Sequence, residues 1–393
     1  MTLSIYAPIG IIGPMLRRAQ GVAPAKADRP ILGCVLLSAG HDGVLTVTAS
    51  SGTMTLIQRV SLGLDAVRDS GEVAVDARRL ATVVGGLPGD TVALALTGKT
   101  GKGIVEVKGG GSRYRLNADD AADYPPSAGH GANVVAVGSV PDVTVIKGSD
   151  LGRMISETTF AICEDANRYG LNGLLIESVE AAADGGARLR FATTDGSRLS
   201  WSEGPASAAV ALNKHKKLLS RAFLAELGKL ISGAEQEWTF TIGARWISAR
   251  CGDVELSGVL VEGEFPDYRQ VLPAGGPKRV ATVGGADLAA ALKRAALMAS
   301  DRNTSVRLAF GESTLTISAQ DLQAGSVVEE VACVLDGRPI ETGFNARYLL
   351  DILSATRAAE VRIEMGGGAL DPVIIKTDGR ADAVFVVMPM RLD

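Results

Sequence analysis

Hydrophobic and polar positions alternate along this chain with two different periods. Residues 11–22 place apolar side chains at the spacing of an amphipathic helix, and residues 76–85 do the same before Gly86 and Pro88. Each helical segment is followed by short strand-like runs that turn residues separate. The pattern therefore predicts a helix and three strands, and then a second helix and three more strands.

The same order recurs twice further along the chain. Helices are predicted at 147–162, 220–231, 286–299 and 345–356, with strands after each of them. Ser149 is the expected N-cap of the helix at 147–162. Leucine or methionine marks a matching place in each helix: Met15, Leu151 and Leu288 in the first helices, and Leu80, Leu224 and Leu349 in the second.

The repeat divides the chain into three domains of one topology. We expect them to span residues 1–136, 137–272 and 273–393, because segments rich in proline and glycine lie at 123–133 and 265–277. Strands that come in pairs with short turns indicate antiparallel sheets. The expected fold class is α+β, with two helices packed on antiparallel sheets in each domain. One large α/β enzyme is the alternative, and the lack of strand–helix–strand units disfavours it.

The last eight residues, 386–393, are apolar where most chain ends are polar. Two valines end a predicted strand, and Pro389 stops its hydrogen-bond ladder. Met388, Met390 and Leu392 then stand on an extended end. Alone they fit a strand end tucked into a core. As the third domain ending of strand and proline, with no domain after it, this stretch is free to line a groove, and methionine suits a surface with several partners.

Composition bounds the class of protein and its compartment. The chain has 393 residues, 46% of them hydrophobic, and a formal net charge of −4, so it has ample core and is not a polycation. No basic segment followed by an apolar one opens the chain, and no run of about 18 apolar residues occurs, so we expect no signal peptide and no membrane partner. Four widely spaced cysteines are typical of a reduced, cytoplasmic protein.

No catalytic or metal-binding pattern stands out. The histidines, His41, His130 and His215, have no cysteine or carboxylate at ligand spacing. Residues 98–100 (GKT) resemble the end of a phosphate-binding loop, but Ala93 stands where such a loop requires glycine. We therefore expect no catalytic residues, no metal and no cofactor.

Positive charge gathers on the predicted helices and beside them. Each cation alone fits an ordinary solvated helix face, but helices at equivalent places of a repeat can face one direction. Their charges would then add up to one basic surface, which suits a phosphate backbone held without reading its sequence. The residues concerned are Arg17, Arg18, Arg78, Arg79, Arg153, Arg221, Lys229, Lys293, Arg294 and Arg347 in helices, and Lys26, Arg29, Lys214, Lys216 and Lys217 beside them.

Six short motifs occur in order along nearly the whole chain. They are RPILG at 29–33, RYGLNG at 168–173, TDGSRL at 194–199, FPDYRQVLP at 265–273, GFN at 343–345 with Tyr348, and VMPMRL at 387–392. Together they resemble the bacterial DNA polymerase III beta subunits, the replicative sliding clamps. The resemblance implies three tandem DNA-clamp domains and a head-to-tail homodimer that closes a ring around duplex DNA. Such a clamp is opened by an ATP-driven loader, hydrolyses nothing and gives the replicative polymerase its processivity.

The resemblance also implies a peptide-binding cleft between the second and third domains. Its expected partners are the DNA polymerase III alpha subunit, the clamp loader delta subunit and other proteins with a clamp-binding motif. The cleft residues carried over by motif are Leu171, Thr194, Gly196, Ser197, Arg198, Leu199, Pro266, Gln270, Val271, Asn345, Tyr348, Val386, Val387, Met388, Pro389, Met390, Arg391 and Leu392. The DNA-binding residues carried over are Lys26, Arg78, Arg79, Tyr169 and Arg221.

The side chains of this set suit a peptide for physical reasons as well. Leu171, Leu199 and Val271, together with the two methionines of the tail, can form an apolar pocket. Arg198 and Asn345 can then fix a peptide backbone by hydrogen bonds.

Several positions depart from the family pattern. The family often has histidine where Ser197 stands, arginine at Gln270 and a second tyrosine at Gly170. Asp393 adds a negative charge after the usual terminal leucine, and the linker 127–140 is longer than usual. A divergent secondary clamp, or a monomeric peptide-binding scaffold without DNA loading, is therefore the alternative function. A nucleotidyltransferase is disfavoured because no metal-binding carboxylate pair is recognisable.

Overall fold

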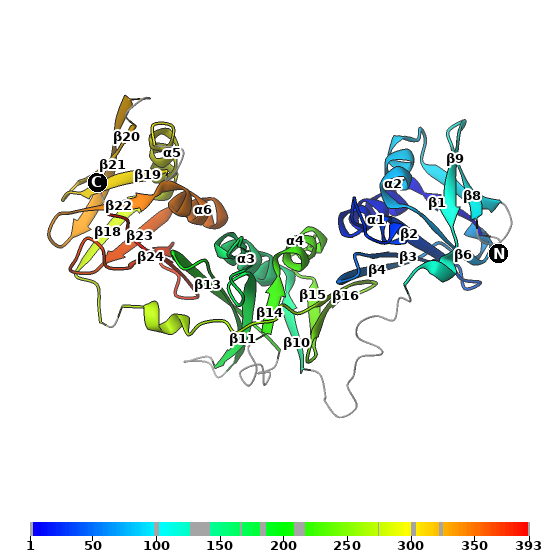
Figure 1. Cartoon of the computed structure of the whole chain (residues 1–393), viewed down its shortest axis with the longest axis horizontal. Helices are drawn as coiled ribbons and strands as arrows, with labels where there is room; N and C mark the ends of the chain where they lie inside the picture. Colours follow the sequence, from blue (N-terminus) through cyan, green and yellow to red (C-terminus); the bar gives the residue numbers. More distant parts are fainter. Residues whose placement is uncertain are drawn as a thin grey trace. The chain divides into compact units, whose positions relative to one another are not determined.

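The computed structural model describes residues 3–97, 102–125, 142–165, 167–180, 186–207, 217–273, 275–299, 304–321 and 325–391. Figure 1 labels the helices and strands of the chain, which divides into two compact units. Unit 1 comprises Met1–Gly148 and Ala222–Leu260, and unit 2 comprises Ser149–Arg221 and Val261–Asp393. The division runs through the middle of the second sequence repeat, so the units do not coincide with the repeats.

Unit 1 is built on a 13-stranded antiparallel sheet, and its helices α1 and α2 pack against each other. The helices are α1 (Ile9–Val22), α2 (Ala77–Gly86) and α4 (Arg221–Leu230), with the 3-10 turns η1 (Pro30–Gly33), η2 (Leu64–Ala66) and η3 (Ala121–Asp123). The strands are β1 (Ser4–Pro8), β2 (Cys34–Ala39), β3 (Val44–Ser50), β4 (Met54–Ser61), β5 (Val67–Asp69), β6 (Gly71–Asp76), β7 (Thr91–Thr97), β8 (Lys102–Gly109), β9 (Ser112–Asp119), β10 (Asp142–Lys147), β15 (Glu237–Ile242), β16 (Trp246–Cys251) and β17 (Val254–Val259).

Unit 2 is built on a 12-stranded antiparallel sheet, and its helices α5 and α6 pack against each other. The helices are α3 (Gly148–Thr158), α5 (Gly285–Ala296) and α6 (Ala346–Thr356), with the 3-10 turns η4 (Thr159–Ala161) and η6 (Tyr268–Val271). The strands are β11 (Gly173–Glu180), β12 (Ala187–Thr194), β13 (Arg198–Pro205), β14 (Lys217–Ser220), β18 (Arg279–Gly284), β19 (Ser305–Phe310), β20 (Thr314–Asp321), β21 (Gly325–Asp336), β22 (Ile340–Asn345), β23 (Glu360–Met365), β24 (Val373–Thr377) and β25 (Ala383–Val387).

The described elements form six half-repeats of strand, helix and three strands, and the short strand β5 is an addition between the first two. The helices lie where the periodicity predicts them, but the strand that leads into each helix was missed, as were β5, β13, β17 and β21. Ser149 is the second residue of α3, not its N-cap. The matching residue of α1 is also corrected: counted from the helix start, Leu151 and Leu288 are fourth, and the fourth residue of α1 is Ile12, not Met15.

Apolar spacing explains why these helices form and which face they bury. In α6, Ala346, Leu349, Ile352 and Leu353 are buried, which is the stripe of an amphipathic helix. The side chain of Asn345 caps its start by accepting a hydrogen bond from the backbone N–H of Arg347 at 2.9 Å. The stripe joins a core that also contains side chains from β22 and β25. This packing fixes α6 beside the C-terminal strand.

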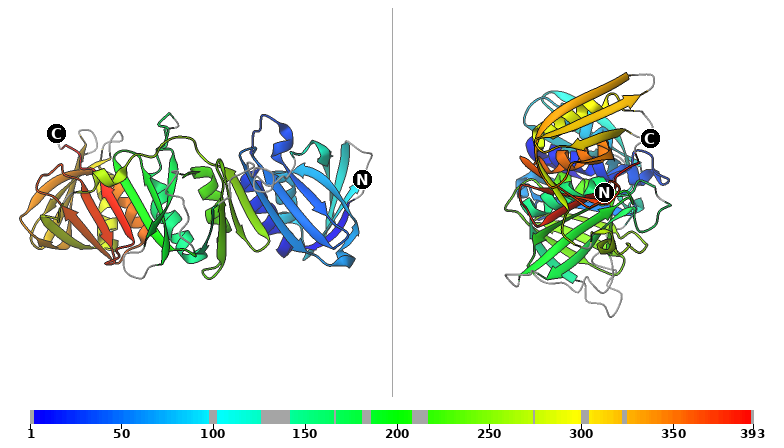
Figure 2. Two further views of the ribbon diagram at one scale, coloured as in Figure 1. Left: turned by 90° about the horizontal axis from the view of Figure 1, so that it is seen from below. Right: turned by 90° about the vertical axis from the view of Figure 1, so that its left-hand side faces the viewer.

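Two strand pairings join neighbouring sequence repeats within a unit. β4 pairs with β17 in unit 1, and β13 pairs with β25 in unit 2; we call these pairings the unit 1 seam and the unit 2 seam. Figure 2 shows β25, in red, beside the green strands of the preceding repeat. In both seams the last strand of a first half-repeat meets the last strand of a second half-repeat.

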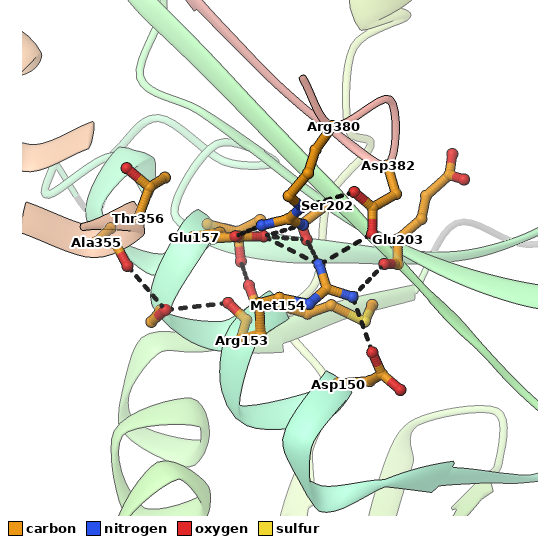
Figure 3. Close-up of polar contacts among 12 residues, drawn as sticks. Asp150, Arg153, Met154, Glu157, Ser202, Glu203, Ala355, Thr356, Arg380 and Asp382 are labelled. Atoms are coloured by element: carbon orange, nitrogen blue, oxygen red, sulfur yellow. Dashed lines mark hydrogen bonds and ion pairs between the residues drawn. The ribbon is translucent and has the colours of Figure 1, made fainter. Parts of the chain in front are cut away.

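A buried ionic cluster holds one end of the unit 2 seam (Figure 3). Glu157 of α3 is 2% exposed, and its carboxylate accepts hydrogen bonds from Arg153 at 3.2 Å and from Arg380 at 2.5 Å. Ser202 of β13 donates a third, at 2.5 Å. Arg380, which precedes β25, also pairs with Asp382 at 2.9 Å. A buried carboxylate with this many donors ties α3, β13 and the C-terminal repeat together.

No helix in the described part of the chain combines the length and the apolar character needed to cross a membrane.

Candidate functional site

Two hollows meet at the other end of the unit 2 seam. The first, which we call the apolar cleft, has a volume of about 270 Å³, and the second, the polar groove, about 450 Å³. The apolar cleft is lined by Arg168, Leu171, Thr194, Gly196, Arg198, Leu199, Pro266, Asp267, Tyr268, Val271, Val386 and Met388. The polar groove is lined by Ile162, Glu164, Arg168, Asp195, Ser197, Arg198, Thr304, Asn345, Arg347 and Tyr348.

The turn between β12 and β13 forms the wall that both hollows share. Asp195 Oδ1 accepts hydrogen bonds from the backbone N–H groups of Ser197, at 2.9 Å, and Arg198, at 3.1 Å. Gly196 has a φ of +93°, and a Cβ there would lie 2.9 Å from the guanidinium of Arg168. Only glycine therefore suits this position, and the turn is held rigid next to the cleft.

The guanidinium of Arg198 is used for hydrogen bonds within the protein itself. It donates to Asp195 Oδ2 at 2.9 Å, to Asp351 Oδ2 at 2.6 Å and to the carbonyl of Phe160 at 2.6 Å. The group also lies 4.4 Å from the ring centroid of Tyr348, and the side chain is 9% exposed. Arg198 thus acts as a rigid base for Tyr348, which differs from the expected role of binding a peptide backbone.

The side chain of Asn345 is also partly used within the protein. Its side-chain oxygen caps α6, so its amide NH2 is the part that another molecule can bind. Ser197 and Tyr348 join it in the polar groove. Hydrogen-bond donors therefore dominate this hollow, whereas apolar side chains dominate the cleft.

The C-terminal tail is held by two backbone hydrogen bonds. The N–H of Met388 donates to the carbonyl of Ser197 at 2.9 Å, and that of Met390 donates to the carbonyl of Gly343 at 2.8 Å. Val386 and Met388 line the apolar cleft. Val387 does not, because side chains alternate along β25 and this one is fully buried in the core of unit 2.

The rest of the predicted tail lies outside both hollows or outside the described residues. Pro389 and Met390 are half-buried beside the cleft, and Arg391 is exposed. None of these three is among the residues that line either hollow. Leu392 and Asp393 lie beyond the residues that the structure describes.

The linker 265–272 forms the opposite wall of the cleft. Phe265 and Tyr268 are buried, with their rings 6.1 Å apart in an edge-to-face arrangement. The hydroxyl of Tyr268 accepts a hydrogen bond from Arg190 at 3.0 Å and donates one to Glu177. Burial, with the hydrogen bond to Glu177, raises the pKa of Tyr268 to about 12.

One predicted cleft residue on this linker, Gln270, is not among the residues that line either hollow. Gln270 is exposed, and its amide donates to Asp267 at 3.3 Å. Val271, which is 46% exposed, lines the cleft beside it. The 3-10 turn η6 explains the difference, because adjacent residues of a tight turn point in different directions.

Sequence reasoning missed several lining residues. Arg168, Asp267 and Tyr268 stand inside two of the six family motifs, beside residues that were predicted to line the cleft. Their position in these motifs could have identified them. Arg347 lies in the first turn of α6, between the predicted residues Asn345 and Tyr348 in the sequence. Asp195 likewise stands inside the TDGSRL motif. Ile162, Glu164 and Thr304 had no signal beyond closeness to a motif, since their part in the groove depends on tertiary packing.

The predicted DNA-binding residues lie in both units. Lys26, Arg78 and Arg79 are exposed in unit 1, the arginines in the first turn of α2. In unit 2, Tyr169 is 76% exposed, and Arg221 donates to the carbonyl of Ile162 at 2.6 Å. Arg221 also lies 3.6 Å from Glu164, so part of its charge is neutralised.

Two other helix cations are neutralised within unit 2. Arg153 belongs to the ionic cluster around Glu157, and Arg294 pairs with Glu329 at 2.6 Å. The expectation that every helix cation adds to one basic surface is therefore wrong for these two residues.

The remaining sequence predictions concern chemistry. His41 is exposed, and its Nε2 lies 2.8 Å from Ser70 Oγ. His130, His215, residues 98–100 and the whole linker 127–140 lie outside the described residues. Within the described ranges no group of three or more metal-ligating side chains occurs. The four cysteines are free thiols.

Comparisons with known proteins give consistent matches. The sequence matches the DNA polymerase III beta subunit N-terminal domain over residues 12–128, the central domain over 145–267 and the C-terminal domain over 269–391. It is 33% identical over 378 residues to the beta sliding clamp of Salmonella typhimurium and 32% identical over 379 residues to that of Escherichia coli, with 96% of each chain covered.

Solved structures agree with the sequence matches. The DNA polymerase III subunit beta sliding clamp of Pseudomonas aeruginosa, bound to griselimycin, superposes with a TM-score of 0.86 at 29% identity. The corresponding clamp of Bartonella birtlesii, also bound to griselimycin, superposes with a TM-score of 0.88 at 25% identity. Both comparisons cover 100% of each chain.

Proposed function

This chain belongs to the DNA polymerase III beta subunit family, and on that premise we propose that it works as a head-to-tail homodimeric ring around duplex DNA. It is a DNA sliding clamp, a non-catalytic processivity factor. We propose that its three clamp domains span residues 1–136, 137–272 and 273–393, so that each contains two half-repeats of strand, helix and three strands.

The topology of the seams supports the head-to-tail dimer. Each seam joins the last strand of a first half-repeat to the last strand of a second half-repeat. Among the described strands, two half-repeat endings have no such partner, β9 in unit 1 and β21 in unit 2. Pairing β9 of one chain with β21 of a second follows the same rule, and two such pairings close a ring.

Side chains on these two strands are complementary. β9 exposes Arg113, Tyr114 and Arg115 in sequence, whereas β21 exposes Val328, which is 65% exposed, and Glu330. In the proposed pairing a basic and aromatic edge meets an acidic and apolar one. Such complementarity sets partner choice and register.

Charge reversal tests this interface. Arg115→Glu and Glu330→Arg should each shift the chain from dimer to monomer in sedimentation at micromolar concentration, because each places like charges opposite each other. An equimolar mixture of the two variants should recover the dimer, because both interfaces of the mixed ring then pair opposite charges. Glu312→Arg, an exposed charge outside both strands, is the matched control and should remain a dimer. A dimer that both reversals leave intact would overturn the pairing.

The cleft supports the docking function. An apolar pocket beside a donor-rich groove is a site for a short linear peptide, whose apolar anchor enters the pocket. We propose that the DNA polymerase III alpha subunit, the clamp loader delta subunit and other proteins with a clamp-binding motif dock here, in the cytoplasm.

The ring function has a topological test. A loaded ring should remain on nicked circular DNA and should be lost rapidly once that DNA is linearised, because only the ring holds it there. Equal retention on both DNAs would contradict the proposal. A chain that sediments as a monomer and binds peptide without loading would favour the alternative, a peptide-binding scaffold.

A further inference from the structure

The linker 265–272 packs against one face of the unit 2 sheet, where charged side chains stand side by side on three strands. Glu177 of β11 lies directly opposite Arg190 of β12, which in turn lies opposite Glu203 of β13. Arg190 donates to Glu203 at 2.7 Å and lies 3.6 Å from Glu177. Opposite charges that alternate across neighbouring strands stabilise the pairing of those strands. This charged row is therefore a fixed part of the sheet.

Glu177 attaches the linker to this row. Its residue is 9% exposed, and its carboxylate accepts hydrogen bonds from the hydroxyl of Tyr268 and from the guanidinium of Arg269, which lies 3.1 Å from each carboxylate oxygen. The backbone N–H groups of Tyr268, Gln270 and Leu272 donate to carbonyls within the linker itself, so the turn η6 reaches the sheet through its side chains. A buried carboxylate with charged and neutral donors is a strong point of attachment.

The attached linker forms one wall of the apolar cleft. The linker residues that line the cleft are Pro266, Asp267, Tyr268 and Val271, whereas Glu177 is not among the residues that line either hollow. A wall that is in place before a peptide arrives spares the complex the cost of ordering it. From these contacts we propose that Glu177 is a positioning residue for peptide docking, which fixes the linker wall from outside the cleft. The inference rests on the proposed docking function and adds to it the group that preorganises the site.

Trp201 of β13 gives this attachment a spectroscopic signal. Its ring centroid lies 4.4 Å from the guanidinium of Arg190, and the ring packs against the apolar cluster that contains Tyr268. Trp201 is the only tryptophan in the sequence of unit 2, since Trp238 and Trp246 belong to unit 1. Detachment of the linker would expose the ring. Quenching of Trp201 fluorescence by acrylamide therefore reports whether the linker is attached.

Glu177→Ala tests the positioning role with a labelled apolar clamp-binding peptide. The full-length variant should bind the peptide roughly three- to tenfold more weakly than the unaltered chain, because each binding event must then order the wall. Acrylamide should quench Trp201 more strongly in the free variant, and saturating peptide should reverse the increase. Glu177→Gln keeps an acceptor oxygen for the Tyr268 hydroxyl, so its affinity should fall between the two. This second variant also carries the test if the alanine variant does not fold.

Glu364→Ala is the matched control in the same sheet. Glu364 is 8% exposed and accepts hydrogen bonds from Arg362 of β23 at 2.9 Å and Lys376 of β24 at 3.1 Å, so the change removes a comparable carboxylate whose partners are not on the linker. Peptide affinity and Trp201 quenching should both stay unchanged. Unchanged affinity or unchanged quenching in Glu177→Ala, or an equal loss of affinity in Glu364→Ala, would overturn the positioning role and leave the cleft standing. Failure of the unaltered chain to bind the peptide would instead overturn the docking function itself.

Discussion

The two seams have the same backbone and different side chains. In unit 1, Arg59 donates its N–H to the carbonyl of Asp253, and Val259 donates to Thr53. At the same two ends of the unit 2 seam, the N–H of Glu203 donates to the carbonyl of Asp382, and the N–H of Met388 donates to the carbonyl of Ser197. Even the turns correspond, since Gly52 and Gly196 have φ values of +91° and +93°.

Side chains at equivalent positions of the two seams differ in polarity. Met54 and Leu56 of β4 stand where β13 has Arg198 and Ser200. Gln58 donates to a helix carbonyl of α1 at 2.9 Å, whereas Ser202, its equivalent, joins the charged cluster around Glu157. The unit 1 seam is thus mainly apolar, while the unit 2 seam has an arginine cluster at each end.

The difference explains why the cleft is at the unit 2 seam. Arg198 binds both Asp195 in the turn 195–197 and Asp351 of α6, and so holds these two elements beside the hollow. The position of Met388 corresponds to Val259, after which the chain continues into unit 2. Met388 itself is 36% exposed and lines the cleft, so its apolar side chain is available to a partner.

Breaking the ionic cluster should give the largest effect. Arg380→Met should lower the free energy of unfolding by roughly 2–4 kcal/mol, because Glu157 stays buried with one cation fewer. Gln58→Met, at the equivalent seam of unit 1, should cost within about 1 kcal/mol, since it removes one neutral hydrogen bond. Urea unfolding of both variants measures the contrast, and equal losses would remove the distinction between the seams.

Arg198→Met copies the residue of the unit 1 seam into unit 2. We expect a loss of roughly 1–3 kcal/mol in the free energy of unfolding, because Asp195 and Asp351 lose their shared partner. Peptide affinity should fall too, since Tyr348 loses the group on which its ring rests. Met54→Leu is the control and should stay within about 1.5 kcal/mol. Unchanged peptide affinity would show that Arg198 does not position the cleft.

Tyr268→Phe tests the linker wall. Loss of the hydroxyl should cost about 1–2 kcal/mol of unfolding free energy, because Glu177 and Arg190 lose a shared hydrogen-bond partner. Tyr124→Phe is a matched change in unit 1, where the hydroxyl makes only 3.4 Å contacts with two carbonyls, and should cost less. The reverse order would contradict the role of the Tyr268 hydroxyl.

Tyr268 also has a pH signature. Its pKa is raised to about 12 in the folded chain, against about 10 for an unperturbed tyrosine. Its contribution to stability is therefore complete below about pH 10 and is lost as the pH rises toward 12. Tyr268→Phe should flatten this part of the stability curve, and an identical alkaline decline in both proteins would be the contrary result.

An exposed ion pair beside the unit 1 seam should matter least. Lys229 pairs with Glu226 at 2.6 Å, but its side chain is 62% exposed. Lys229→Met should therefore change the free energy of unfolding by less than about 0.5 kcal/mol. A loss as large as that of Arg380→Met would mean that charge stabilises both seams alike.

Sequence periodicity was enough to locate the repeats and the helices. Leu80, Leu224 and Leu349 are each the fourth residue of their helix, because amphipathic spacing is a local property. The leading strands were missed because a run of five or six residues, such as Ser4–Pro8, has too few alternations to stand out.

The motifs predicted residues that line the cleft, but they could not predict the hydrogen bonds that those residues form. Leu171, Leu199 and Met388 line it as expected. That Arg198 is used internally could not be read from the chain, since its partner Asp351 lies 153 residues away. Val387 was misplaced because a motif names neighbours without saying which face of the strand each side chain takes.

The most direct measurement is an anisotropy titration of a labelled apolar clamp-binding peptide against two chains, the full-length protein and one that ends at Val387. Sedimentation at the same concentrations reports the dimer. We predict that the shortened chain loses peptide binding and keeps its dimer, because Met388 lines the cleft whereas β9 and β21 lie elsewhere in their units. An intact dimer that binds the peptide with unchanged affinity would contradict the assignment of the cleft to the C-terminal tail.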